Sequence, residues 1–137
     1  MNMDLTAEWA RRPWWLNLIL LFCLFMTFIY SPFDVVFKPV ADDQDVWFGY
    51  MFTGIAAKIG GVLHWIVYAA LAWGIWRMAP WAWWLGSLYA TQVALAMFLW
   101  PLLNGMGGWA YSVVAGALFA VPAVALWRSR TRFGGGA

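Results

Sequence analysis

Residues 14–31 read WWLNLILLFCLFMTFIYS, an apolar run with no charged side chain. Three further apolar runs cover residues 55–77, 81–103 and 109–127. A helix rises about 1.5 Å per residue, so about 20 apolar residues cross a hydrocarbon core of about 30 Å. Because backbone groups in lipid must bond within their own segment, we expect each run to be a helix. The sequence therefore predicts an all-α, polytopic membrane protein with four transmembrane helices.

The composition agrees with this class. Of the 137 residues, 65% are hydrophobic and 10% are charged, whereas a soluble domain has about 25% charged residues. The four spans and their connections fill nearly the whole chain, which predicts a single domain over residues 1–137 with short cytoplasmic tails. The net charge of +2 is small and scattered, which argues against nucleic acid as a partner.

The basic residues predict an orientation. Both lysines fall on one side of the predicted spans, and all the arginines flank the other side, namely Arg11, Arg12, Arg77, Arg128, Arg130 and Arg132. The positive-inside rule places the arginine side in the cytoplasm. We therefore expect an integral protein of a bacterial inner (plasma) membrane with both termini in the cytoplasm.

The connections predict how the spans are arranged. Residues 78–80 and 104–108 are short and rich in turn formers, so they join antiparallel neighbours. The resulting expectation is an up-down four-helix bundle. The first connection, residues 32–54, is too long for a structureless loop in so compact a protein.

Two short interfacial helical segments are predicted within that first connection. Residues 31–34 read SPFD, which is typical of a helix start with a serine cap, a proline and a first-turn acid. Pro39 should end this segment. Residues 42–45 read DDQD and resemble an acidic cap. The apolar residues 46–52 that follow are expected to lie in the interface or to extend the second helix outward.

Four carboxylates gather in the same connection: Asp34, Asp42, Asp43 and Asp45. A cation is one interpretation, but calcium needs six to eight oxygens from a defined loop, and no such spacing is present. Asp42 and Asp45 are sufficiently explained as a cap and a first-turn charge. We therefore predict no metal site.

Small residues recur at helical spacing in two spans. Ala57 and Gly61 are four residues apart, and Ser112, Gly116 and Ala120 continue the pattern in the fourth span. Small side chains let membrane helices approach closely. We predict that these five residues pack helices together, either within the bundle or against a partner. The terminal, fourth helix is the predicted docking face.

Polar residues inside membrane spans are the best pointers to function. The predicted ligand-binding residues are His64, Lys58, Gln92, Thr27, Tyr111 and Trp65. A polar cluster in the outer half of the spans is expected around His64, with Lys58 at the outer boundary and Gln92 near the midplane. For His64 two interpretations stay open, a ligand or proton role and a structural hydrogen bond. Lys58 is expected to extend its ammonium group to the outer boundary.

No catalytic residue is predicted, because no complete catalytic, nucleotide or metal motif is present. A b-type haem needs two axial ligands, and the chain has one histidine, which argues against haem. Zinc needs several Cys, His or acidic ligands. The cofactor is left open, with a lipid or other hydrophobic ligand as the candidate.

These observations favour a non-enzymatic membrane protein, either an accessory or assembly subunit of a larger complex or a binder of a lipid in an outer-leaflet pocket. Its expected partners are membrane lipid and other membrane subunits or copies of itself. Two alternatives remain. One is a small oligomeric channel or transporter, and the other is a membrane enzyme acting on a lipid or isoprenoid through His64 and the loop carboxylates.

Overall fold

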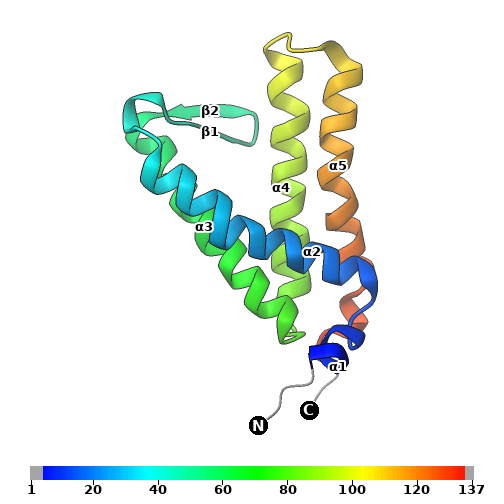
Figure 1. Cartoon of the computed structure of the whole chain (residues 1–137). Helices are drawn as coiled ribbons and strands as arrows, with labels where there is room; N and C mark the ends of the chain where they lie inside the picture. Colours follow the sequence, from blue (N-terminus) through cyan, green and yellow to red (C-terminus); the bar gives the residue numbers. More distant parts are fainter. Residues whose placement is uncertain (1–4, 135–137) are drawn as a thin grey trace.

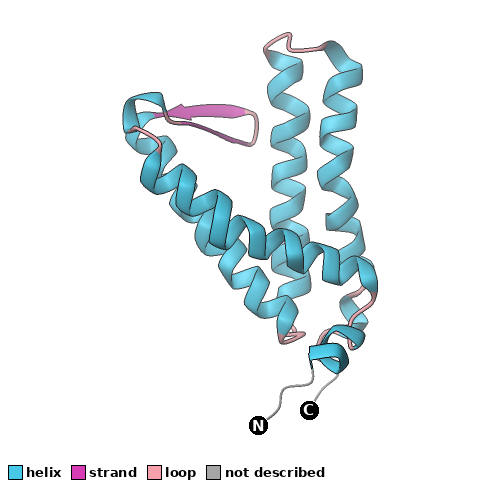
Figure 2. Ribbon diagram, viewed as in Figure 1, coloured by secondary structure: helices cyan, strands magenta, loops and turns pink. Residues whose placement is uncertain are grey.

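The computed structural model describes residues 5–134, which are mostly helical (Figure 2). The long helices are α2 (Trp14–Phe25), α3 (Gly54–Trp76), α4 (Ala82–Leu103) and α5 (Gly108–Arg128). The shorter elements are α1 (Leu5–Ala10), η1 (Met26–Tyr30), η2 (Phe33–Phe37), η3 (Val40–Asp42), β1 (Gln44–Trp47), β2 (Tyr50–Thr53) and η4 (Arg130–Arg132).

Four helical stretches in the described residues are long and apolar enough to cross a membrane: Trp14–Phe37, Gly54–Trp76, Ala82–Leu103 and Gly108–Arg128. The prediction of four such helices is therefore confirmed. The first stretch is longer than expected, because α2 continues through the π-helical segments η1 and η2.

The expected break at residue 31 is wrong. Ser31 is 4% exposed and lies inside the continuous helix, and Pro32 has helical backbone angles (φ −58°, ψ −41°). Proline removes one backbone donor from a helix, and the wider π-helical turns on both sides of Pro32 fit such a local change in bonding. The helix ends at Lys38, whose extended backbone is the conformation favoured before a proline. Pro39 therefore ends the segment as expected.

The helices form two pairs rather than one evenly packed bundle (Figure 1). In one pair, α4 and α5 lie side by side along most of their length. In the other, α2 and its continuation pack on α3. The pairs meet near α1, at the terminal end, where Leu71, Leu126 and the backbone at Gly86 come together. At the opposite end, called here the hairpin end, the pairs diverge.

The second expected interfacial helix is instead a β-hairpin. β1 and β2 are antiparallel, with Gln44 opposite Thr53 and Trp47 opposite Tyr50. The two turn residues, Phe48 (φ 52°) and Gly49 (φ 86°), both have positive φ, as the tight turns that match strand twist require. A side chain at Gly49 would begin 2.8 Å from Leu99 Cβ. The hairpin therefore spans from α3 to α4 at the hairpin end (Figure 1).

The acidic-cap interpretation is also wrong. The residue before α3 is Thr53, and no side chain caps this helix. Asp43 and Asp45 instead form ion pairs with side chains of the helical segments. The carboxylates therefore join separate elements. The chain is mostly helical, as expected, and the hairpin is its one departure from all-α within the described residues.

Candidate functional site

A cavity of about 460 Å³ lies under the hairpin, between the two helix pairs. Its apolar walls come from α2 and η1 on one side and from α4 and α5 on the other, and include Phe22, Phe25, Met26, Val93, Met97 and Phe119. Its polar side chains gather toward the hairpin end and are called here the polar rim: Tyr30, Ser31, Asp34, Lys38, Gln44, Asp45 and His64.

His64 is held by three side chains from other elements. Its Nε2 lies 3.3 Å from Asp45 Oδ1, and its Nδ1 is hydrogen-bonded to the Tyr89 hydroxyl. The Trp47 ring stacks on the imidazole, with centroids 4.2 Å apart and planes 18° apart. His64 thus joins β1, α3 and α4, and both of its ring nitrogens are engaged.

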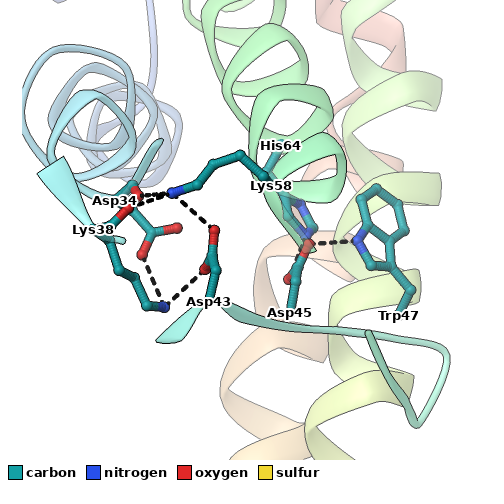
Figure 3. Close-up of polar contacts among 7 residues, drawn as sticks. All are labelled: Asp34, Lys38, Asp43, Asp45, Trp47, Lys58 and His64. Carbon is teal, nitrogen blue, oxygen red and sulfur yellow. Dashed lines mark hydrogen bonds and ion pairs between the residues drawn. The ribbon is translucent and has the colours of Figure 1, made fainter. Parts of the chain in front are cut away.

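Asp45 is fixed from two sides. Its Oδ2 accepts a hydrogen bond of 2.7 Å from Trp47 Nε1, while Oδ1 faces His64 (Figure 3). Burial acts to raise the pKa of Asp45, but the interactions with His64, together with hydrogen bonds from Trp47 and the Val46 backbone, more than offset this, so the pKa lies below its ordinary value. The carboxylate is therefore ionised wherever the hairpin is docked near neutral pH.

Gly60 makes this docking possible. A Cβ at Gly60 would lie 2.2 Å from Asp45 Oδ2 and 2.8 Å from Trp47 Nε1. The Asp45 and Trp47 side chains therefore rest directly on the backbone of α3. The absence of a side chain at Gly60 therefore lets the hairpin contact α3. The pattern of small residues in the sequence predicted helix packing and not this contact.

Next to this contact, two lysines and two aspartates form a second cluster (Figure 3). Lys58 Nζ donates to Asp43 and to the backbone carbonyls of Asp34 and Lys38, all at 2.9 Å. Lys38 Nζ lies 3.0 Å from Asp43 Oδ1 and 3.3 Å from Asp34 Oδ1. The Lys58 ammonium group is therefore held by Asp43 and by the end of the first helix, and its position at the outer boundary stays a prediction.

The shared carboxylate of this cluster is Asp43, which is 2% exposed. Burial acts to raise the pKa of Asp43. The hydrogen bonds and positive charges of Lys58 and Lys38 lower this pKa by more, so it lies below its ordinary value. The same contact with Asp43 is the largest cause of the raised pKa of Lys38. The cluster fixes the end of the first helix to α3 and to the start of the hairpin.

Of the predicted ligand-binding residues, His64 lines the cavity and the others lie elsewhere. Thr27 donates to Cys23 O within its own helix, and its carbonyl accepts a hydrogen bond from Trp65. Tyr111 is 53% exposed on α5. The fold therefore does not gather these predicted side chains around His64.

Gln92 is buried, with 6% exposure, one turn after Tyr89 on α4. Neither Nε2 nor Oε1 of its amide has a hydrogen-bond partner in the described part of the chain. A buried amide without a hydrogen-bond partner costs free energy of folding. Such groups in proteins are commonly bonded to a buried water molecule.

The small residues pack helices within this chain. Ala57 is 1% exposed, and a Cβ at Gly61 would lie 3.3 Å from the Val35 side chain on the first helix. On α5, Ser112 is fully buried, and a Cβ at Gly116 would lie 2.9 Å from Phe98 Cβ on α4. Ser112 and Gly116 therefore pack within the α4–α5 pair, which gives no support to α5 as a docking face through these residues.

Several site residues were missed. Trp47 and Tyr89 were not among the predicted site residues, and Asp45 was assigned to a cap. The β-branched and aromatic residues on either side of the glycine-containing Phe48-Gly49 pair are the signal that indicates the hairpin and, with it, the approach of Asp45 to α3.

No protein-family model, curated protein sequence or solved structure matches this chain. Within residues 5–134, no group of three His, Cys, Asp or Glu side chains is placed to hold a metal ion. The geometry of the cavity and its polar rim is therefore the basis on which a function is argued.

Proposed function

We propose that this is an integral membrane protein that binds a lipid or similar amphiphile in the cavity beneath the hairpin, without catalysing a reaction on it. The observation that carries the proposal is the two-sided character of this cavity. Its walls are mostly apolar side chains from three helices, and its charged side chains and His64 lie toward the hairpin end. An amphiphile has the same division into an apolar body and a polar head.

The size and opening of the cavity support a lipid. About 460 Å³ falls within the range of about 300 to 1,000 Å³ typical of small-molecule sites. Phe22 and Phe25 line the cavity and are also 43% and 47% exposed. The cavity therefore opens sideways, onto the apolar surface that lipid would cover, and an acyl chain enters without crossing water.

The charge distribution supports the proposed orientation. At the hairpin end, Lys38 and Lys58 are neutralised by Asp34 and Asp43. All arginines belong to the terminal end or its turns, so the uncompensated positive charge is at that end. Under the positive-inside rule this favours cytoplasmic termini and places the cavity in the outer leaflet of a bacterial inner membrane.

The other predictions from the sequence carry less support. Because both ring nitrogens of His64 are engaged, we assign this residue to holding the hairpin rather than to a reaction. An accessory subunit, or a small oligomeric channel or transporter, stays a prediction from the sequence. The cavity favours lipid binding over both.

The test is to fill the cavity. Val93→Trp places a large ring in its wall, and Leu88→Trp on the same helix, at a position 64% exposed, is the matched control. Each variant is purified in polymer-bounded native membrane discs, and bound lipid is measured by native mass spectrometry. Wild type and Leu88→Trp should retain a specific lipid that Val93→Trp loses. Equal retention by all three proteins would contradict the proposal.

A further inference from the structure

The charged groups of the polar rim indicate which head group the cavity accepts, an argument that rests on the proposed lipid binding. The two lysines near the rim are already paired with carboxylates of this chain. Lys58 uses its ammonium group on Asp43 and two backbone carbonyls. Lys38 lies between the carboxylates of Asp34 and Asp43. An anionic head group therefore finds no uncompensated cation here.

An acceptor, in contrast, is available. Asp34 lines the cavity, and its side chain is 25% exposed. Its Oδ1 pairs with Lys38, but no donor within residues 5–134 bonds to Oδ2, which has no dashed contact in Figure 3. The oxygens of Asp45 differ, because one faces His64 and the other accepts from Trp47. Asp34 Oδ2 is thus the carboxylate oxygen of the rim that is left for a ligand.

The net charge points the same way. The two clusters contain three carboxylates (Asp34, Asp43 and Asp45) and two ammonium groups (Lys38 and Lys58). One negative charge is in excess when His64 is neutral, and none when it is protonated. In neither state is there a positive excess, and charge interactions strengthen where the surroundings are apolar.

We infer that the cavity selects lipids whose head donates a hydrogen bond and carries no negative charge, with Asp34 Oδ2 as the acceptor. A hydroxyl head and a primary ammonium head share this chemistry. A phosphate or sulfate head does not, because it brings a second anion to Asp34.

The experiment uses three amphiphiles with the same chain: oleyl alcohol, oleylamine and oleyl sulfate. The full chain is placed in phosphatidylcholine nanodiscs at pH 7, and the binding of each probe is measured by native mass spectrometry. The alcohol, the amine or both should bind about tenfold or more tightly than the sulfate, the effect of one hydrogen bond to a charged group. Equal binding of the alcohol and amine identifies a hydroxyl site, and tighter binding of the amine identifies an ammonium site.

Asp34→Asn tests the acceptor, because the amide keeps an oxygen for Lys38 but removes the charge. Asp42→Asn, at an exposed carboxylate of the same connection, is the control. Asp34→Asn should weaken the preferred probe about tenfold, and Asp42→Asn should leave it unchanged. Preference for the sulfate, or identical behaviour of the two variants, would overturn the inference. If no probe binds while Val93→Trp still loses its native lipid, the inference fails and the lipid-binding proposal stands.

Discussion

His64 Nε2 lies 3.3 Å from Asp45 Oδ1, across a separation of 19 positions in the chain, and this pair holds the hairpin against α3. The same imidazole bonds to Tyr89 on α4 and stacks on Trp47 of β1. A single side chain thus closes the hairpin end of the cavity by joining three elements.

Replacing His64 should release the hairpin without unfolding the helices. His64→Ala leaves Asp45 and Tyr89 without their shared partner, which typically costs about 1 to 3 kcal/mol. Amide hydrogen exchange in β1 and β2 should accelerate by about tenfold or more, while exchange in α4 and α5 stays unchanged. Asp42→Asn is the control. An unaltered hairpin in His64→Ala would show that the Asp45–His64 pair does not hold it.

Acid should weaken the hairpin end. The pKa values of Asp43 and Asp45 are lowered in the folded protein, so their stabilising contribution is present above the unfolded value of about 4 and is lost as pH falls through the folded pKa. Thermal unfolding followed from pH 7 to pH 3 should show stability falling below about pH 4. Asp43→Asn should be less stable than wild type at pH 7, and the difference should shrink in acid. A constant difference across this range would contradict the assignment.

Two adjacent glycines should respond differently to alanine. At Gly60 a Cβ meets the Asp45 carboxylate at 2.2 Å, whereas at Gly61 the nearest atom is a Val35 methyl at 3.3 Å. Gly60→Ala should therefore displace the hairpin and raise its hydrogen exchange. Gly61→Ala should leave the hairpin docked, since the gain in helix propensity, about 0.5 to 1 kcal/mol, offsets a small adjustment of Val35. The reverse order would be incompatible with the described docking.

Gly116 should matter for the α4–α5 pair rather than for an external partner. Its Cβ would lie 2.9 Å from Phe98 Cβ and 3.3 Å from the Ala94 carbonyl, so Gly116→Leu must separate the helices. Overpacking of this kind costs about 1 to 3 kcal/mol. The variant should unfold at a lower temperature, and Val114→Leu, at a position 61% exposed, should not. Normal stability combined with loss of a co-purifying protein would instead favour α5 as a docking face.

The orientation is tested by accessibility. Asp42→Cys and Arg130→Cys, both at exposed positions, are prepared in a Cys23→Ser background and labelled in intact cells with a membrane-impermeant maleimide. Residue 42 should be labelled from outside, and residue 130 only after the cells are opened. The opposite pattern would reverse the proposed orientation.

The four long helices were predictable because their length and apolar composition leave few alternatives in lipid. The predicted break at Pro32 was wrong because a proline, which ends most helices, is here accommodated by π-helical turns. Residues 46–52 were misread for a different reason. Their apolar character masked the positive-φ turn at Phe48 and Gly49, which makes these residues the turn and parts of both strands of a hairpin.

Of the residues at the hairpin end of the cavity, the sequence predicted His64 but not its partners. His64 was found because an ionisable side chain in an apolar span needs a partner. Its partners were not found, because Asp45 reaches it only through the hairpin, and Tyr89 is one of many aromatic residues in a chain with 20% aromatic content. The partners of Lys58 were not found either, because the rule that a lysine extends to water takes no account of a buried carboxylate nearby.

The contacts of Lys58 bear on the order in which the protein is made. Its ammonium group binds the last carbonyls of the first membrane helix, at Asp34 and Lys38, where the helix dipole is negative and a cation is favourable. The residue that completes this helix end lies 20 positions later than Lys38 in the chain. During synthesis this contact forms only after Lys58 has been added to the chain, so the end of the first helix is completed by the start of the second.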